Sequence, residues 1–427
     1  MTKSVYAYRN RVLSAEAIPL SEIAEEIDTP FYCISAKQLQ RNYRAFATPF
    51  QSLNATIHYA VKANANLAVI RILADCGAGA DITSSGELER ALAGGVPPEK
   101  IVFSGVGKTR DDIAAALLAG VLQINAESVS EIRLIEQVAT VLGKKAPVSL
   151  RINPNVDAKT HAKTSTGHKG VKFGINLDQL SEALGVLMAC EHCSFKGLTI
   201  HVGSMMDNYE PFRLAYQRLA EVVRLLRSQG IEVERLDLGG GVSIAYDGQT
   251  LAPFSDYAAI VQEIFGDLGC ALSLEPGRKL VGDAAVLVTR VVHVKHTDDK
   301  RFLIVDAGMN DLVRPAMYGA RHEIISVREN LDGENSAASV VGPVCETSDS
   351  FGDNFMLPNS LQSGDLLAVM QAGAYGSAMA STYNGRALIP EILVSGAQHA
   401  VIRRRIAVAE QMGWESIPDW MVISRAA

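Results

Sequence analysis

The sequence lacks any apolar run long enough to span a bilayer, and its first residues, Met1–Tyr6, lack the apolar core of a signal peptide. Basic residues are outnumbered by acidic ones, which gives a net charge of -7 at pH 7. Such a charge argues against nucleic acid as the main partner. We therefore expect a cytoplasmic protein that binds neither membranes nor nucleic acid.

Cysteine is scarce and scattered. The six cysteines are Cys33, Cys76, Cys190, Cys193, Cys270 and Cys345, a pattern unlike a secreted disulfide framework. Cys190 and Cys193 have CxxC spacing, but no second ligand pair follows at the spacing of a zinc site. We interpret these two as packing at a helix-to-strand turn, and we expect no metal.

The bulk composition is that of an ordinary soluble protein, with 48% hydrophobic and 20% charged residues. A chain of 427 residues is too long for one simple core and indicates about two or three domains. The internal pattern of the chain must therefore show where the domains divide.

Strand-length apolar runs alternate with helical periodicity over the first two thirds of the chain. The predicted strands are 57–61, 80–83, 101–104, 122–125, 148–152, 197–202, 235–238 and 272–274. The helices predicted between them include 86–93, 109–119, 128–142 and 211–228. About eight such repeats predict a closed (β/α)8 barrel of the TIM type. An open doubly wound sheet is the alternative, although its glycine-rich turn would follow the first strand rather than a late one.

A change of rhythm after Arg278 indicates a second domain. The runs 284–295, 301–306, 339–342 and 365–371 resemble strands with only short helical pieces between them. A strand at 30–34, a helix at 36–50 and a short helix at 20–27, with Ser21 as a candidate cap, precede the barrel. We predict a barrel over 26–280, and a mostly β domain formed by 1–25 with 281–427.

One loop is unusually long, polar and basic. It covers residues 154–170 and follows a predicted barrel strand. Loops of this length in compact domains are commonly functional, so we interpret it as a lid.

Chemically useful side chains stand at the ends of four predicted strands. Lys62 follows the first strand, His201–Ser204 the sixth, Gly239–Gly241 the seventh and Glu275–Arg278 the eighth. Active sites of this barrel type lie at the carboxyl ends of the strands. All four groups are therefore expected at one mouth.

These groups together predict a pyridoxal phosphate site. On its own, a strand-end lysine such as Lys62 is more commonly solvated, but a desolvated lysine has a lowered pKa and can form a Schiff base with a carbonyl. The glycine turn and Ser204 suit a phosphate. Glu275 would keep the ring nitrogen protonated, which strengthens the ring as an electron sink. His201 would stack on the ring, although alone it would be interpreted as a core histidine.

The chain resembles the alanine-racemase-like, fold type III pyridoxal phosphate enzymes, and within them the bacterial diaminopimelate decarboxylases. The resemblance covers nearly the whole chain. It rests on the motifs Tyr59–Asn64, His201–Ser204, Leu238–Gly241, Glu275–Arg278, Gly342–Glu346 and Gly373–Gly376. Each motif is weak alone, but their joint occurrence in this order is specific.

The resemblance implies roles for individual residues. It implies that Lys62 is the cofactor lysine. The implied cofactor shell consists of His201, Ser204, Gly240, Gly241, Glu275, Gly277, Arg278 and Tyr375, with Tyr375 reaching the phosphate from the β domain. Cys345 and Glu346 match a pair that relatives insert from a partner subunit, which implies a homodimer with shared active sites. Cys345 would protonate the α carbon after carbon dioxide leaves, so the catalytic residues are expected to be Lys62, His201 and Cys345.

The implied reaction is decarboxylation of meso-2,6-diaminopimelate to L-lysine and carbon dioxide, the last step of lysine biosynthesis. Its substrate residues would be Arg278, Arg314, Tyr318, Glu346 and Tyr375. Arg278 and Arg314 can fork onto the distal carboxylate, Tyr318 can add a hydroxyl and Glu346 can take the distal amine. Without the resemblance, Arg314 and Tyr318 would be interpreted as a surface turn pair.

Three other functions remain open at this point. The first is decarboxylation of another amino acid, such as ornithine, arginine or a carrier-linked one. The second is racemisation, against which Glu275 argues, because racemases of this fold generally place an arginine at the ring nitrogen. The third is a cofactor-binding homologue without turnover, against which the presence of both Lys62 and Cys345 argues.

Overall fold

The computed structural model describes residues 4–156, 170–329 and 333–421. The chain divides into two compact units. The barrel unit consists of Ser35–Ala285 and Gln371–Ala378, and the β unit consists of Met1–Ile34, Val286–Met370 and Met379–Ala427. The predicted boundaries after residues 25 and 280 thus differ somewhat from those of the structure, and the return of 371–378 to the barrel unit was not foreseen.

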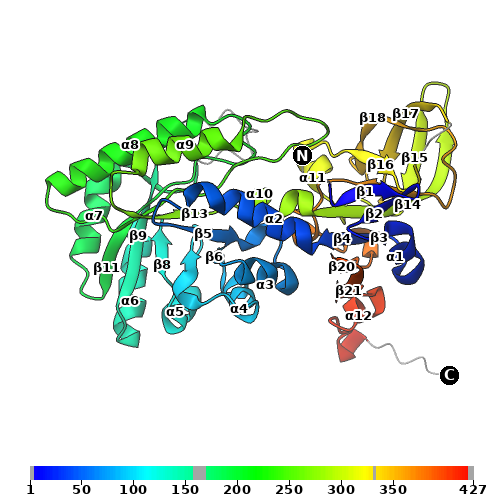
Figure 1. Ribbon diagram of the computed structural model, residues 1–427. Coiled ribbons are helices and arrows are strands. Elements are labelled where there is room, and N and C mark those ends of the chain that lie inside the picture. Colours follow the sequence, from blue (N-terminus) through cyan, green and yellow to red (C-terminus); the bar gives the residue numbers. More distant parts are fainter. Residues whose placement is uncertain (1–3, 157–169, 330–332, 422–427) are drawn as a thin grey trace. The chain divides into compact units, whose positions relative to one another are not determined.

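Eight parallel strands form the barrel (Figure 1). They are β5 (Ala55–Ala60), β6 (Gly79–Ile82), β7 (Ile101–Phe103), β8 (Gln123–Ala126), β9 (Ala146–Asn153), β11 (Cys193–Thr199), β12 (Arg235–Asp237) and β13 (Ala271–Leu274). Strand β13 pairs with β5, and β8 pairs with β9, so the ring of strands is closed. The short β10 (Ile175–Asn176) pairs with β9 outside the ring. The prediction of a (β/α)8 barrel is therefore confirmed, and the open sheet is excluded.

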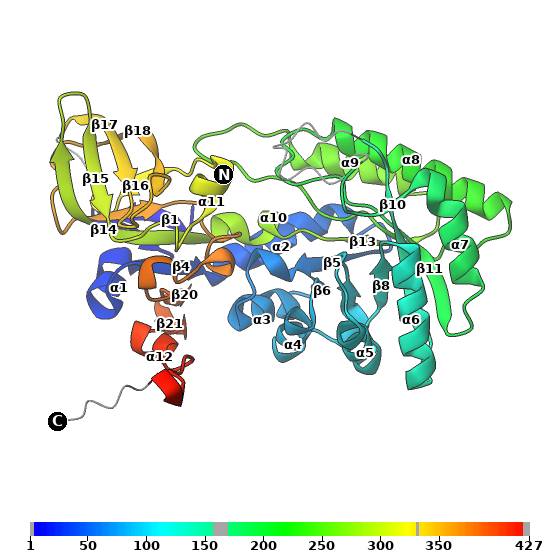
Figure 2. The same ribbon diagram turned by 180° about the vertical axis from the view of Figure 1, so that it is seen from behind.

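The barrel helices surround these strands, as Figure 2 shows from behind. They are α2 (Ala36–Ala47), α3 (Leu67–Asp75), α4 (Ser85–Ala93), α5 (Arg110–Ala119), α6 (Val129–Leu142), α7 (Leu180–Met188), α8 (Glu210–Ser228), α9 (Phe254–Phe265) and the short α10 (Arg278–Val281). Polar caps fix several starts. Thr109 forms a capping box with Asp112, and the Ser128 hydroxyl accepts from the backbone N–H of Glu131. These caps explain why the starts of α5 and α6 match their predicted positions.

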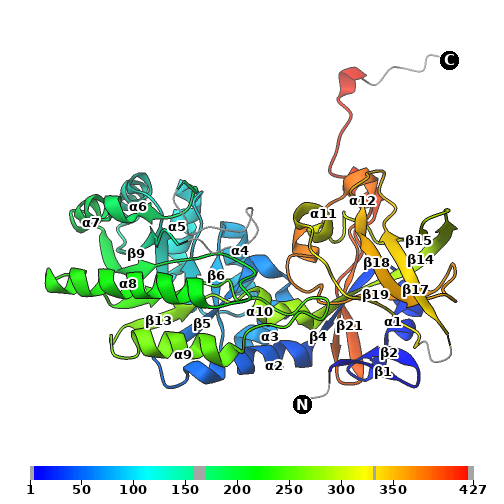
Figure 3. The same cartoon turned by 90° about the horizontal axis from the view of Figure 1, so that it is seen from above.

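The β unit is built on a mixed sheet with the strand order β18-β17-β15-β14-β4-β20-β21 (Figure 3). Its strands are β4 (Phe31–Ser35), β14 (Ala285–His296), β15 (Arg301–Val305), β17 (Asn335–Val341), β18 (Ser350–Pro358), β20 (Glu391–Ser395) and β21 (Gln398–Arg403), with β16 (Ile324–Ser326) and β19 (Leu366–Val369) pairing beside β14. The prediction of a second, mostly β domain is confirmed.

The amino-terminal segment belongs to the core of the β unit. It forms the small sheet β1 (Tyr6–Arg9), β2 (Val12–Ala15) and β3 (Ile18–Pro19), followed by α1 (Leu20–Ile27). Leu13, Leu20 and Ile23 pack in one apolar cluster with Val286 and Ile392. Burial of these side chains fixes the amino-terminal segment to strands from the second half of the chain.

Three local details differ from the predictions or fall outside them. Helix α1 begins at Leu20, so Ser21 lies inside the helix, and no side chain caps it. Strand β5 ends at Ala60, and Lys62 stands in a single 3-10 turn, Val61–Ala63. Most of the predicted lid, residues 157–169, lies outside the described residues. None of the helices in the described ranges has the length and apolar character that crossing a membrane requires.

Candidate active site

Lys62 faces a carboxylate that comes from the neighbouring strand. Its Nζ lies 2.9 Å from Oδ2 of Asp81, whose side chain is completely buried, whereas 39% of the Lys62 side chain is exposed. The pairing of β5 with β6 places Ala60 opposite Asp81, and the 3-10 turn then brings Lys62 back over that position. Strand register therefore creates this ion pair.

The ion pair keeps the Lys62 amine protonated. Burial opposes the charged form, but the negative charge of Asp81, with contributions from Tyr375 and Glu275, outweighs it and raises the pKa of Lys62 above its ordinary value. The sequence led us to expect a lowered pKa from desolvation. That expectation is wrong for this structure, because it did not include the Asp81 partner.

Glu275 is a second buried carboxyl group, and its surroundings favour the neutral form. It follows β13 and is 7% exposed. Burial raises the pKa of Glu275 well above its ordinary value, and the negative charges of Asp237 and Asp81 raise it further. Burial likewise raises the pKa of Asp237, which shares a hydrogen bond with Glu275. A group that brings a positive charge to Glu275 would be stabilised here.

A polar network holds this carboxyl pair in place. Nδ2 of Asn125 donates to Oδ2 of Asp237 and to Oγ of Ser104, at 3.1 Å each. The Ser104 hydroxyl lies 3.4 Å from Oε1 of Glu275. Gln123 fixes the Asn125 amide through a 2.8 Å bond to its Oδ1. Strands β8 and β12, together with the residue after β7, thereby supply the supports of Glu275 from separate parts of the barrel.

His201 is a neutral imidazole at the same mouth. Burial lowers the pKa of His201 well below its ordinary value, and the positive charges of Arg151 and Lys62 lower it further. The backbone N–H of Gly240 donates to Nδ1 at 3.3 Å, which places the ring proton on Nε2. A neutral, oriented, flat ring of this kind suits stacking on another aromatic ring.

The turn Gly239–Gly241 passes so close to other backbone that side chains are excluded. A Cβ on Gly240 would lie 2.2 Å from the carbonyl oxygen of Glu275, and one on Gly241 would lie 2.2 Å from that of Gly203. We expected this turn to present backbone N–H groups to a phosphate. Two of these groups have acceptors within the protein, because Gly239 donates to Asp237 and Gly240 donates to His201.

Arg278 connects the other predicted cofactor residues. Its Nη2 donates to Ser204 Oγ at 3.3 Å, its Nη1 donates to Tyr246 at 2.9 Å, and its guanidinium lies 4.8 Å from the centre of the Tyr375 ring. Gly277, directly before it, approaches Ala63 and Ala60 closely enough that a Cβ would be about 3.0 Å from each of their Cβ atoms.

Tyr375 belongs to the barrel unit, not to the β domain as predicted. Its N–H donates to the carbonyl of Ala63 at 2.8 Å, next to Lys62. The preceding residues make similar contacts, because Gly373 donates to Gly282 and Ala372 donates to Ala285. These backbone hydrogen bonds assign the segment to the barrel, although the strand before it, β19, belongs to the β unit.

A cavity of about 220 Å³ opens among these groups. Its lining is formed by Lys62, Thr83, Ser104, Gly105, Arg151, Phe173, Thr199, His201 and Glu275. The prediction that Lys62, His201 and Glu275 meet at one mouth therefore agrees with the structure. A cavity of this size with a few convergent polar groups is the usual form of a small-molecule site.

Several residues at the site were missed by the sequence analysis. Asp81 and Asp237 lie inside predicted strands, and a buried carboxylate in an apolar strand was the available signal. Arg151 also lies near the carboxyl end of β9, pairs with Glu127 at 2.9 Å and lies over the Phe173 ring at 5.0 Å. The Glu127 partner could not be inferred, because the pairing depends on how neighbouring strands are placed.

Arg314 and its neighbours belong to the β unit. Arg314 is 1% exposed and begins the short helix α11 (Arg314–Tyr318). Its Nη1 lies 2.8 Å from Nε2 of His322, and Nδ1 of His322 lies 2.9 Å from the carbonyl of Met370. Because that carbonyl accepts a hydrogen bond from Nδ1–H, Nε2 is left to accept a hydrogen bond from the guanidinium. The surface-turn alternative is excluded for Arg314, whereas Tyr318 is half-buried.

Cys345 and Glu346 lie on an exposed loop of the β unit. The backbone N–H of Cys345 donates to Oδ1 of Asn384 at 2.8 Å, and the Tyr383 hydroxyl lies 3.2 Å from Glu346. The loop is thus tied to residues 383–384 of its own unit. Arg314, Tyr318, Cys345 and Glu346 are not in the barrel unit, so their part in the site remains a prediction.

Fold and site together define the class of this protein. Residues 36–282, nearly the whole barrel, match the family described as "Pyridoxal-dependent decarboxylase, pyridoxal binding domain". The matched segment contains the lysine, the imidazole, the glycine turn and the buried carboxyl pair described above. The class is that of the pyridoxal-dependent decarboxylases.

Relatives that match over nearly their full length narrow the family to which the chain belongs. The chain is 45% identical to the diaminopimelate decarboxylase of Pseudomonas aeruginosa, over 96% of this chain and 99% of that one. Among solved structures, diaminopimelate decarboxylase from M. jannaschii has a TM-score of 0.93 at 35% identity, covering 98% of this chain and 99% of that one. The Helicobacter pylori enzyme, complexed with L-lysine, has a TM-score of 0.89 at 38% identity, covering 92% and 98%. The chain belongs to the diaminopimelate decarboxylase family.

The cofactor of this family is pyridoxal phosphate, and three observations agree with it. Glu275 is a buried carboxyl group that a protonated ring nitrogen would stabilise. His201 is neutral and oriented for stacking. The glycine turn leaves no room for side chains where a phosphate would approach, with Ser204 and Arg278 beside it. The residues at this site therefore fit pyridoxal phosphate.

Proposed function

We propose that this protein decarboxylates meso-2,6-diaminopimelate to L-lysine and carbon dioxide, as the last step of lysine biosynthesis. The observation that carries the proposal is the barrel cavity in which Lys62, His201 and Glu275 converge. Relatives named for this reaction, alike over nearly their full length, support the choice of substrate. A cytoplasmic location, expected from the sequence, also remains a prediction.

Pyridoxal phosphate, when bound, supplies an electron sink for the electron pair left on the α carbon as carbon dioxide departs. Glu275 would hold a proton at the ring nitrogen, since burial beside Asp237 raises the affinity of its carboxyl group for a proton. His201 would support the ring by stacking. The remaining cofactor shell would consist of Ser204, Gly240, Gly241, Gly277, Arg278 and Tyr375, and the hydrogen bond between Arg278 and Ser204 supports a place for both beside the phosphate.

Lys62 would hold the cofactor through its aldehyde group. For this the amine would have to be neutral, a state that the ion pair with Asp81 opposes. We propose that Asp81 therefore acts as a positioning residue, which holds the amine at a defined place until the cofactor enters. The full burial of the Asp81 side chain keeps this contact rigid.

Recognition of the far end of the substrate is assigned to Arg314, Tyr318 and Glu346 of the β unit together with Arg278 and Tyr375 of the barrel unit. Arg314, with Arg278, would bind the distal carboxylate, Tyr318 and Tyr375 would add hydroxyl groups, and Glu346 would bind the distal amine. The rigid seating of Arg314 against His322 supports this role, because an oriented guanidinium binds a carboxylate in bidentate fashion. A substrate without the distal carboxylate would lack this charge-assisted contact, at a cost of about 1–3 kcal/mol.

The proposal includes a homodimer with active sites shared between chains. Cys345 and Glu346 would enter the site of the partner subunit, where the Cys345 thiol would deliver a proton to the α carbon after carbon dioxide leaves. Their exposure within the β unit is compatible with insertion into another chain. Such an arrangement would be isologous.

A substrate panel tests the proposal. The protein, supplied with pyridoxal phosphate, is incubated with meso-diaminopimelate, ornithine, arginine and lysine, and carbon dioxide release and the amine products are measured. We expect L-lysine from meso-diaminopimelate and little turnover of the others. Turnover of ornithine or arginine with none of meso-diaminopimelate would overturn the substrate, and inversion without carbon dioxide would indicate a racemase.

Arg314→Met probes the specificity argument within the same panel. We expect the KM for meso-diaminopimelate to rise by about tenfold to a hundredfold with a smaller change in kcat, because the lost contact binds a part of the substrate that does not react. Arg321→Met, which removes an exposed arginine of the same unit, is the matched control and should leave KM unchanged. An unchanged KM in Arg314→Met would remove Arg314 from the substrate site.

A further inference from the structure

A cluster of two thiols and a carboxylate lies at the amino end of the barrel strands. Glu136 stands in the middle of α6, Cys190 follows the end of α7, and Cys193 is the first residue of β11. Strand β11 ends at Thr199, which lines the cofactor cavity. The cluster and the cavity are therefore at opposite ends of the same strand, so the mechanism above makes no use of the cluster.

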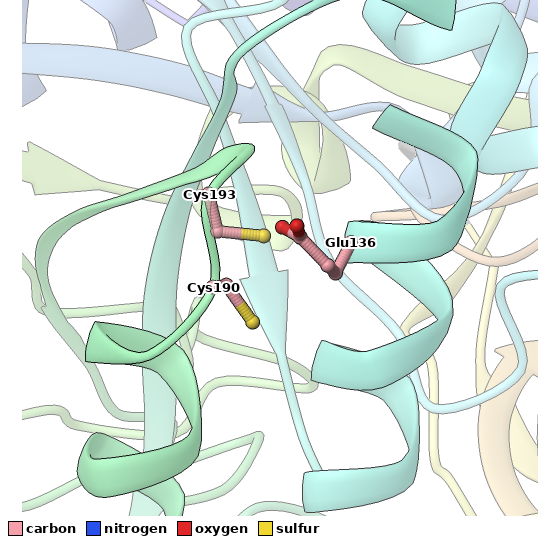
Figure 4. Close-up of side chains that lie close together, drawn as sticks. All are labelled: Glu136, Cys190 and Cys193. Atoms are coloured by element: carbon pink, nitrogen blue, oxygen red, sulfur yellow. The ribbon is translucent and has the colours of Figure 1, made fainter. Parts of the chain in front are cut away.

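The three side chains converge on one point. The two Sγ atoms and a carboxylate oxygen all lie within 4.8 Å of one another. Figure 4 shows the sulfur atoms of Cys190 and Cys193 on the side that faces the Glu136 carboxylate. Ligands around a single tetrahedral zinc ion stand about 3.5–3.8 Å apart, given metal–ligand distances of about 2.0–2.3 Å. If the longest distances between these ligand atoms shortened by roughly 1 Å, the three atoms would have the spacing of ligands around one zinc ion.

The charges around the cluster also favour a cation. Glu136 accepts the backbone N–H of His192 at 2.9 Å, and its Oε1 lies 3.2 Å from the His192 ring. Among the described residues, no lysine or arginine forms an ion pair with Glu136. The Cys190 thiol donates to the carbonyl of Val186 at 3.3 Å. A carboxylate that faces two thiols, with an imidazole beside it, has the composition of a zinc site.

The CxxC spacing alone could not indicate this site, because the third candidate ligand, Glu136, is far away in the sequence. The CxxC pair was interpreted as packing because no second pair follows it in the sequence. Glu136 comes from a different helix, and closure of the barrel brings α6 beside the α7–β11 connection. His192, between the two cysteines in sequence, has its ring next to Glu136 and Thr140.

We propose that Glu136, Cys190 and Cys193 bind one Zn²⁺ ion, with His192 or water in the fourth position. Each thiol loses its proton to solvent as its sulfur binds the ion, and no electrons are transferred. The ion connects α6 to the α7–β11 connection and stabilises the amino end of the barrel. Its role is structural, because active sites of this barrel type lie at the carboxyl ends of the strands, opposite the cluster.

The test uses the full-length holoenzyme. The protein is purified with Zn²⁺ present, dialysed without chelator, and its metal content is measured by mass spectrometry. We expect one zinc ion per chain. Replacement by Co²⁺ should give red d–d bands and sulfur-to-cobalt charge transfer, and the d–d bands lie well away from the absorption of the cofactor. Zn²⁺ should also raise the melting temperature.

Variants locate the ion. Cys190→Ser and Cys193→Ser should each lose the stoichiometric zinc and the charge-transfer band, and Glu136→Gln should weaken binding by about tenfold or more. Cys76→Ser, which removes a half-buried thiol at the end of α3, is the matched control and should keep both. Decarboxylase activity at moderate temperature should be unchanged in all four variants.

Three results would overturn the proposal. The first is a wild-type holoenzyme that binds neither Zn²⁺ nor Co²⁺ with stoichiometry, a result that does not depend on any variant folding. The second is full zinc content in Cys190→Ser and Cys193→Ser, which would place the ion elsewhere, for example at the exposed Cys345. The third is a Cys190–Cys193 disulfide in peptide maps of the freshly isolated protein.

Discussion

Two buried carboxyl groups at the barrel mouth, Asp81 and Glu275, differ in the charges that surround them. Asp81 faces the Lys62 amine at 2.9 Å and stabilises a cation. Glu275 lies beside Asp237, and burial together with the negative charge of that neighbour raises the pKa of Glu275 well above its ordinary value. The difference arises from position alone, because the two carboxyl groups are chemically alike.

Asp81→Asn should move the attachment of pyridoxal phosphate to lower pH. The pKa of Lys62 lies above its ordinary value because Asp81 outweighs burial, so an uncharged amide of the same shape lets burial lower that pKa. The neutral amine that attacks the cofactor is then available at a lower pH. The pH dependence of the cofactor absorption band, with borohydride trapping and peptide mapping to Lys62, measures the shift.

Asp75→Asn is the control for this experiment, since Asp75 is an exposed carboxylate that pairs with Arg71 on α3. It should leave the midpoint of attachment where it is in the wild type. A midpoint in Asp81→Asn that stays the same or rises would mean that Asp81 does not hold the charge of Lys62.

Glu275→Gln should keep the cofactor bound but slow the reaction. An amide cannot keep the ring nitrogen protonated, so the ring would be a weaker acceptor of the electron pair that develops in the reaction. We expect kcat to fall by about a hundredfold or more, similar to the loss of one preorganised group at a developing charge. Steady-state rates with cofactor content measured in parallel check this, and near-wild-type kcat at full occupancy would contradict it.

At the scale of helices and strands, periodicity was informative for the barrel and weak for the β unit. All eight barrel strands are buried or nearly so, and alternating helices with polar caps separate them, so their positions were predictable. Strands β18, β20 and β21 were not predicted. Their burial does not alternate regularly. Strand β20 pairs with β4, far away in sequence, whereas β18 and β21 are the edge strands of the sheet and pair with β17 and β20, so burial leaves only a weak pattern in their sequences.

The active-site residues also divide into those that local sequence predicts and those that depend on pairing between strands. Lys62, His201 and Glu275 could be placed from strand ends, because parallel strands point their carboxyl ends at one mouth. Asp81 could not, since its contact with Lys62 depends on the register between β5 and β6. A lateral shift of one residue would turn Asp81 away, and no local sequence feature specifies that register.

Gly240→Ala should disrupt the turn that lies beside His201 and Glu275. Its Cβ would lie 2.2 Å from the carbonyl oxygen of Glu275, so the backbone must move. We expect a lower melting temperature, consistent with a loss of about 1–3 kcal/mol, and weaker retention of pyridoxal phosphate on dialysis. Gly185→Ala, in α7, is the control. A Cβ there meets nothing within 4 Å, so the protein should be as stable as the wild type or slightly more.

Wild-type stability and cofactor retention in Gly240→Ala would show that the turn can relax, and that its close approach to Glu275 is not needed for the site.

At the scale of the whole molecule, the proposed function needs two chains. Lys62 belongs to the barrel unit, and Cys345 belongs to the β unit. If the proposed dimer shares its sites, Lys62→Ala and Cys345→Ala are inactive alone but complement each other. After unfolding and refolding of an equal mixture, about half of the dimers contain both variants, and each such dimer has one intact site. We therefore expect about a quarter of the wild-type activity.

Activity of the mixture no greater than the sum of the separate variants would instead place Lys62 and Cys345 of one chain in the same site. A mixture of either variant with itself, taken through the same procedure, controls for losses during refolding.

The return of residues 371–378 to the barrel unit has a consequence for biosynthesis. Ribosomal synthesis is vectorial, and residues 286–370 are made between the main part of the barrel and this segment. The nascent barrel therefore lacks the hydrogen bond from Tyr375 to Ala63, and the ring that Arg278 faces, until most of the chain has left the ribosome. If Tyr375 belongs to the cofactor shell as proposed, an aborted translation product that ends before residue 371 would lack that part of the binding site.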